Sequence, residues 1–153
     1  MTERHDSVIL HFVARVFMVP FILVFGIYVL IHGEASPGGG FQAGAIVASG
    51  IVLGRLTLGS DHSENRFPIS LLIWLSSLGV GIYVVAGVIP MLFGGNYLDY
   101  NELPVLWFNN VAEHARTARA MGIFIVEIGV FIAVLSTLVI LYDYLTLRVQ
   151  DDD

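Results

Sequence analysis

The chain has 153 residues, of which 56% are hydrophobic and only 13% are charged, and its mean hydropathy is +0.80. This composition excludes an ordinary soluble domain and indicates an integral membrane protein. The absence of cysteine excludes disulfides, thiolate metal sites and a cysteine nucleophile, and the net charge of −6 argues against nucleic acid as a partner.

Four apolar stretches are long enough to cross a membrane, because a helix needs about 20 residues to span a hydrocarbon core of ~30 Å. They cover residues 8–31, 41–58, 69–92 and 119–142. We therefore predict a single membrane domain over residues 1–153, an all-α bundle of four transmembrane helices, with an acidic C-terminal tail at 143–153.

The first span carries polar residues at both of its ends. The polar N-terminus lacks the short apolar run and cleavage site of a signal peptide, so we expect the span to be retained. Arg15 can extend its side chain back to the interface, and His11 lies one turn earlier on the same face. His32 and Glu34 follow the span. These four residues either anchor the helix ends or belong to a path for protons or cations.

Between the first two spans, the segment HGEASPGGGFQAGA at 32–45 interrupts the apolar sequence. At membrane depth, irregular backbone survives only where protein or water satisfies its polar groups. The lysine and Ser/Thr of a phosphate-binding loop are missing after these glycines. We predict a compact turn in which glycine allows positive φ and close backbone approach, with Phe41 anchoring the next helix. Its residues are Pro37, Gly38, Gly39, Gly40, Phe41 and Gln42.

The second span is rich in small residues, which include Gly44 paired with Ala48 and Gly50 paired with Gly54 at four-residue spacing. Small residues at this spacing let transmembrane helices approach closely. We therefore predict protein neighbours on several sides of this helix.

The connections set the expected orientation. Pro68 suits the first turn of the third helix, where its missing N–H is harmless. The third connection, near residues 94–117, is rich in aromatic and acidic side chains, which predicts either an interfacial aromatic belt or a lid over a neighbouring subunit or ion entrance. The basic residues favour cytoplasmic termini, because four arginines fall on the terminal side and two on the other: Arg4, Arg55, Arg66 and Arg148 against Arg116 and Arg119.

The fourth span has two distinct faces. At 100° per residue, its small residues share one side, and Glu127 points nearly the opposite way. The small residues are Ala118, Gly122, Gly129, Ala133 and Ser136. One face invites close helix packing and the other carries a carboxyl that should avoid lipid, so we expect both to need protein or water and infer a larger assembly.

Glu127 lies eight residues after Arg119, which is ~12 Å along a helix axis. An intramembrane acid is costly unless it faces a cavity, a partner or a base. Glu127 is therefore either a proton or cation relay or a structural acid that joins two helices.

The sequence offers no catalytic constellation, since no nucleophile has a positioned base. We expect no enzymatic activity, no cofactor and no metal site.

The segment SPGGGFQAGAI between two apolar spans resembles the signature of the MnhB family, the B subunit of multisubunit Mrp-type Na+/H+ antiporters. The last span, MGIFIVEIGVFIAVLSTLVILYDYL, is similar to the family's C-terminal span, in which an acid is followed by glycine, here Glu127 and Gly129. Length, helix number and helix order also match over nearly the whole chain.

This resemblance implies a non-catalytic subunit of a hetero-oligomeric Na+/H+ antiporter in a prokaryotic plasma membrane, with larger antiporter-like subunits as partners. Similar subunits occur in membrane-bound hydrogenases, which leaves a structural subunit of such an energy-converting complex as the alternative. An independent small transporter ranks third.

Overall fold

The computed structural model describes residues 11–33, 39–58, 68–100 and 111–151. Within these residues the chain is helical, without strands, and four helices are long and apolar enough to cross a membrane. These candidate spans are His11–Ile31, Gly39–Thr57, Ile69–Leu92 and Arg116–Thr146. The predicted fold class, an all-α membrane protein with four transmembrane helices, is confirmed.

The first span begins with a wider helical turn. The π-helical segment η1 (Ala14–Met18) leads directly into α2 (Val19–Ile31), and the backbone N–H of Val19 donates to the carbonyl of Ala14. Pro20 occupies the first turn of α2, where its missing N–H is tolerated. Helix α3 (Gly39–Leu58) follows, and α5 (Ile69–Leu92) comes directly after Pro68.

Helix α6 (Val111–Asp151) is longer than the predicted span at both ends. Residues 143–151, which we assigned to an acidic tail, form its last turns instead. The sequence DYLTLRVQD contains neither glycine nor proline, so nothing in it stops a helix that is already formed.

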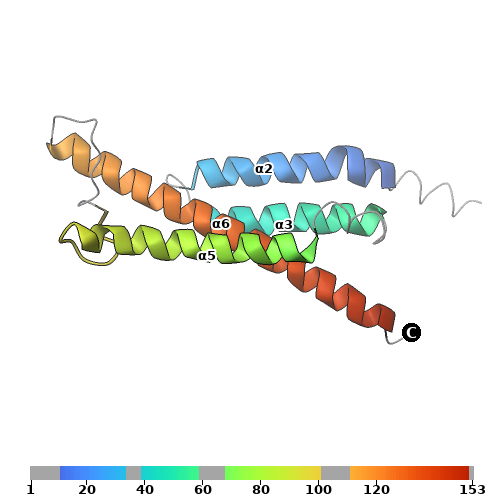
Figure 1. Cartoon of the computed structure of the whole chain (residues 1–153). Helices are drawn as coiled ribbons and strands as arrows, with labels where there is room; N and C mark the ends of the chain where they lie inside the picture. The colour runs from blue at the N-terminus through green and yellow to red at the C-terminus, as the bar shows by residue number, and fades with distance from the viewer. Residues whose placement is uncertain (1–10, 34–38, 59–67, 101–110, 152–153) are drawn as a thin grey trace, which may run out of the picture.

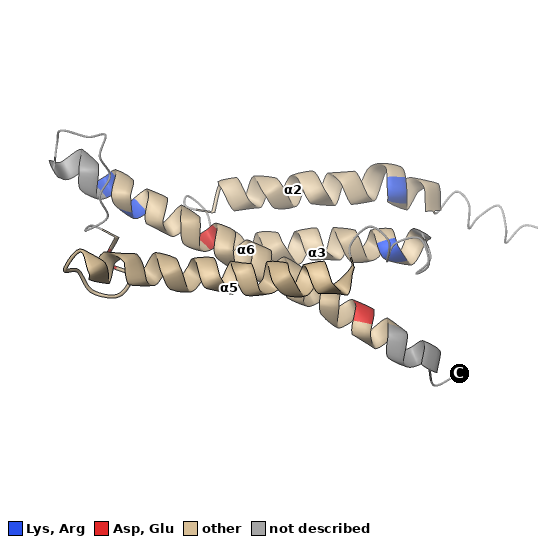
Figure 2. Ribbon diagram, viewed as in Figure 1, with Lys and Arg blue, Asp and Glu red and all other residues tan. Residues whose placement is uncertain are grey.

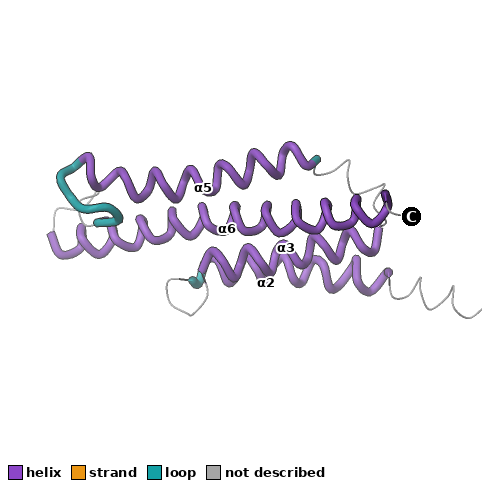
Figure 3. Tube along the Cα trace, turned by 90° about the horizontal axis from the view of Figure 1, so that it is seen from below, coloured by secondary structure: helices purple, strands orange, loops and turns teal. Residues whose placement is uncertain are grey.

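The helices form a row in the order α2, α3, α6, α5. Helix α6 packs against α3 on one side and α5 on the other, and α2 packs mainly on α3. Figure 3 shows α6 between its two neighbours, with α2 at the edge of the row. The central helix α6 therefore organises the molecule.

Glycine makes the closest helix crossings possible. A Cβ on Gly79 would lie 2.6 Å from both the carbonyl oxygen of Gly129 and the backbone nitrogen of Ala133, so α5 and α6 meet backbone to backbone. A Cβ on Gly44 would lie 2.9 Å from the carbonyl oxygen of Phe131 in α6. The close packing predicted at Gly44 is confirmed.

Helices α2 and α3 also meet at a glycine. A Cβ on Gly50 would lie 3.0 Å from the Ile22 side chain, so this position is closely packed as predicted. Gly54 is looser, because its nearest neighbour, Val19, would be 3.9 Å away, an ordinary van der Waals distance.

Both faces of α6 are covered by the chain itself. Gly129 and Ala133 on its small-residue face meet α5, and Glu127 on the opposite face meets α3. We predicted protein or water against both faces, and the chain's own helices place protein there. These two faces do not by themselves require a larger assembly, however, because the chain's own helices supply both neighbours.

The helices are staggered along their axes. Ser76 Oγ lies 3.0 Å from Thr137 Oγ1, which together with the Gly79–Gly129 contact places α5 beside residues 119–142 of α6. Helix α3 runs parallel to α6. Its residue Gly40 meets Glu127, which is eight residues after Arg119, so α3 begins well inside the segment of α6 that α5 accompanies. In Figure 1, α5 and α6 accordingly continue well past the adjacent ends of α2 and α3.

Candidate functional site

The carboxyl group of Glu127 lies against the backbone where α2 ends and α3 begins. A Cβ on Gly33 would lie 2.8 Å from Glu127 Oε2, and a Cβ on Gly39 would lie 2.9 Å from Oε1. Gly40 abuts the carbonyl group of Glu127. Any side chain at these three glycines would therefore displace the acid or the helix that carries it.

Gly39 is required for its backbone conformation as well as its small size. Its φ is +80°, in the left-handed region that only glycine enters at little cost. The predicted positive φ in the glycine run is thus found at Gly39. Pro37, Gly38 and Glu34 lie outside the described residues.

The start of α3 gives the carboxyl a favourable electrostatic environment. The first N–H groups of a helix have no acceptor within it, and the helix dipole places partial positive charge there. The half-buried carboxyl of Glu127 lies at this end of α3.

The depth of this site is set by the stagger. Glu127 is eight residues inside the segment of α6 that α5 accompanies, which corresponds to ~12 Å. Figure 2 shows charged positions toward the ends of the described helices, apart from one acidic position on α6 beside the start of α3. Glu127 therefore lies well inside the candidate membrane span Arg116–Thr146.

His32 is at the same end of α2 as Gly33. Its Nδ1 lies 3.0 Å from the carbonyl oxygen of Tyr28, and its ring stacks on Tyr28 with centroids 4.1 Å apart. Phe21 and Phe25 extend this stack along the exposed side of α2. The imidazole is thus held close to the glycine backbone that borders Glu127.

Arg15 and His11 are not brought to Glu127. Gly54 packs on Val19, and Gly26 packs on Ala43, which fixes α2 antiparallel to α3. Both basic residues therefore lie near the far end of α3, exposed in this chain. The structure separates the polar residues proposed from sequence into two groups at opposite ends of the α2–α3 pair.

Arg55 of α3 forms a buried ion pair with Asp143 of α6, which sequence reasoning missed. Their side chains are 5% and 11% exposed. We counted Arg55 only as an orientation signal and placed Asp143 in the tail. The available signal was a basic and an acidic residue near the same end of two spans, which is where charges on neighbouring helices can pair.

Phe41 does not anchor α3 within this chain, because 65% of its surface is exposed. Gln42 and the neighbouring Ser49 are also exposed. Within this chain the glycines, and not the aromatic ring, hold this helix start against α6, so an anchoring role of Phe41 stays a prediction.

The described part of the third connection packs on the chain itself. The Tyr97 ring contacts Gly87 of α5, and the Tyr100 ring contacts Gly122 of α6. Burial is the main cause that raises the pKa of the Tyr100 hydroxyl, and the nearby Tyr83 and Tyr97 raise it further. These two rings pack on α5 and α6, but residues 101–110 of the connection lie outside the described residues, so the choice between an aromatic belt and a lid stays a prediction.

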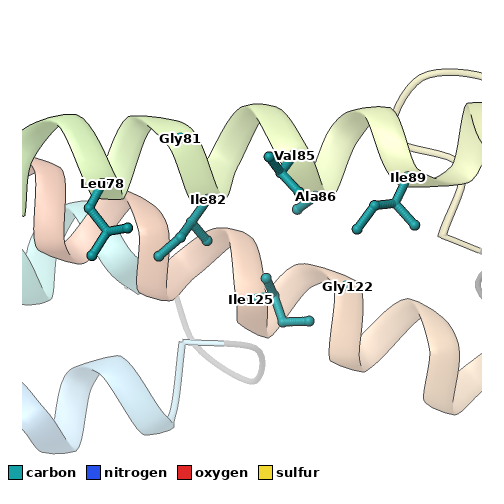
Figure 4. Close-up of a pocket in the computed structure, with 8 residues that line it drawn as sticks. All are labelled: Leu78, Gly81, Ile82, Val85, Ala86, Ile89, Gly122 and Ile125. Atoms are coloured by element: carbon teal, nitrogen blue, oxygen red, sulfur yellow. The ribbon is translucent and has the colours of Figure 1, made fainter.

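A cavity of about 470 Å³ lies between α5 and α6. Figure 4 shows its apolar lining, which comes from Leu78, Gly81, Ile82, Val85, Ala86, Ile89, Gly122 and Ile125. Such a cavity offers no ligand to a cation. Among the described residues there is also no group of three or more His, Asp or Glu side chains that could hold a metal.

Comparison with known proteins identifies a family. Residues 9–140 match the family described as a domain related to the MnhB subunit of Na+/H+ antiporter. The chain is 30% identical over 121 residues to the B subunit of the Na(+)/H(+) antiporter of Bacillus subtilis (strain 168), which covers 76% of this chain and 82% of that protein. It is 31% identical over 139 residues to the putative antiporter subunit mnhB2 of Staphylococcus aureus (strain Newman), which covers 88% and 96% of the two chains.

Proposed function

Since the chain belongs to the family of the MnhB subunit of Na+/H+ antiporters, we propose that Glu127 is the residue through which it takes part in proton or cation movement. The protein is a multi-pass membrane protein and a subunit of a multisubunit Na+/H+ antiporter.

A single observation supports the role of Glu127. Its carboxyl oxygens lie against Gly33, where α2 ends, and Gly39, where α3 begins, inside the candidate span Arg116–Thr146. An ionisable side chain inside a membrane span most often marks a proton or ion path. This position therefore favours a relay over a purely structural acid.

The test is antiport by the intact complex in everted membrane vesicles across a pH series. Glu127→Gln keeps the size and hydrogen-bonding capacity of the side chain but removes its titratable proton. We expect at least a several-fold loss of Na+-dependent proton movement or a shifted pH profile, with the complex still assembled.

Asp143→Asn is the matched control, because it neutralises the other described acid within the spans, which is paired with Arg55. We expect it to lower assembly without a specific change in the pH profile. An unchanged profile in the Glu127→Gln complex would remove Glu127 from the transport path and leave a scaffold subunit.

The subunit itself is proposed to be non-catalytic, with both termini in the cytoplasm of a prokaryotic cell. The excess of arginine on the terminal side supports this orientation. A protease site placed after residue 153 should be cut in everted vesicles and protected in intact cells. The reverse pattern would invert the topology.

A further inference from the structure

Gln42 lies inside the candidate span Gly39–Thr57, and the stagger of α3 places it beside the middle of the α6 candidate span, Arg116–Thr146. Gly40 lies beside Glu127, so Gln42 is further along α6, at about the level of Val130. That level is the middle of the 119–142 segment that α5 accompanies, ~16 Å from Arg119 along the helix. The sequence alone places Gln42 near the end of its span, so its depth comes from the stagger.

At this depth the Gln42 side chain is exposed. No hydrogen bond joins its amide to another residue in the part of the chain that the structure describes. Transfer of an amide into hydrocarbon without a hydrogen bond is strongly unfavourable. Lipid is therefore a poor environment for this face of α3.

The residues around Gln42 indicate a dry contact and not a water-filled path. They lie on the side of α3 turned away from α2 and α6, and we call this surface the Gln42 face: Phe41, Gln42, Ala45, Ser49 and Leu56. Phe41 and Leu56 are 65% and 62% exposed, and the Ser49 hydroxyl already donates to the Ile46 carbonyl at 2.7 Å. The face thus offers one unsatisfied polar group within an apolar surface.

Small residues on this face allow another helix to come close. Ala45 and Ser49 are four residues apart and follow Gln42 by one and two helical turns. Small residues at this spacing combined with a hydrogen-bonding side chain are the features that associate helices in lipid.

We propose that the Gln42 face docks on a transmembrane helix of another antiporter subunit, which hydrogen-bonds to the Gln42 amide through a carbonyl or polar side chain. This proposal rests on the chain being a subunit of a complex and is independent of any role of Glu127 in transport.

The first test uses a photo-crosslinking amino acid at Ala45 in the full complex, purified through a tag on a different subunit. Val80 is the matched control, since it is 53% exposed at a similar depth but belongs to α5. We expect a covalent product between this chain and another subunit from position 45 and not from position 80. If the substituted residue prevents assembly at position 45 but not at position 80, that result also supports a tight contact at Ala45.

Three results would overturn the proposal. Products with lipid only would show a lipid-facing surface, and products with a second copy of this chain would show the wrong occupant. Rapid modification of a Gln42→Cys complex by a water-soluble thiol reagent would show an aqueous path, provided that the label is read on this chain, which has no native cysteine.

A second measurement isolates the hydrogen bond. Gln42→Leu should reduce recovery of this chain with the tagged subunit several-fold, whereas Val80→Leu should leave recovery unchanged. Equal recovery of the two variants would contradict a hydrogen bond from Gln42 to a partner.

Discussion

At the scale of single residues, the two charged sites of the helix row differ in kind. Glu127 lies against glycine backbone at a helix start. Arg55 and Asp143 neutralise each other in a buried pair near the other end of α3. The first site is the one proposed to act in transport, and the second suits a fixed helix register.

The requirement for glycine at position 39 can be tested by adding a single methyl group. Gly39→Ala should destabilise the helix start by about 1–3 kcal/mol, because the residue has φ +80° and its Cβ would meet the Glu127 carboxyl. Antiport by the assembled complex should fall with it.

Gly94→Ala is the matched control. Gly94 also has a positive φ, +90°, but nothing lies within 4 Å of its Cβ position. We expect it to retain antiport. If the two variants behave alike, the contact with Glu127 has no special role. Antiport retained by Gly39→Val and Pro37→Leu as well would mean that the glycine motif tolerates change.

The Arg55–Asp143 pair can be tested by exchanging its charges. Arg55→Ala should cost about 3–5 kcal/mol, because it leaves a buried carboxylate without its partner. Arg55→Asp combined with Asp143→Arg should recover much of the thermal stability of the complex. A double variant no more stable than the single ones would mean that the pair does not set the register.

At the scale of helices, contact between backbones decides how the row is built. Helices α5 and α6 cross where Gly79 meets Gly129, and α3 and α6 cross at Gly44. Without a hydrophobic driving force between helices in lipid, this close approach supplies the packing energy. Helix α6 can therefore have two close neighbours on opposite faces.

The α5–α6 crossing predicts that two glycines of α5 differ in their tolerance of substitution. Gly79→Ala should lower the stability of this chain by roughly 1–3 kcal/mol, because its methyl group would overlap the α6 backbone. Gly81→Ala should be tolerated, since that position faces open space. Thermal inactivation of the two complexes makes the comparison, and equal midpoints would show that the crossing can relax without cost.

At the scale of the whole molecule, the row leaves broad apolar faces uncovered. Only 11% of the most apolar window of the first span is buried, and the aromatic stack on α2 is exposed. Lipid can cover apolar side chains, but it cannot satisfy the Gln42 amide. Partners are therefore needed at a specific face, and the rest of the surface can remain in lipid.

The amount of this chain in the membrane should depend on the other subunits. Expressed without the other subunits, the chain should be recovered from membranes in several-fold lower amount, because the Gln42 face lacks its partner. Immunodetection with and without co-expression of the partner subunits measures this. Equal recovery would show that the chain is stable alone.

The sequence by itself determined the class, the four spans and the family, because membrane length and apolar content are local properties that need no partner to be recognised. It also identified the two faces of α6, since helical periodicity places Glu127 opposite Gly129. Only the tertiary structure decided the row order, the offset start of α3 and the Arg55–Asp143 pair. Those features depend on the register between helices far apart in the chain. Register is set by backbone contacts at particular glycines, and a one-dimensional pattern of small residues does not say which helix meets which.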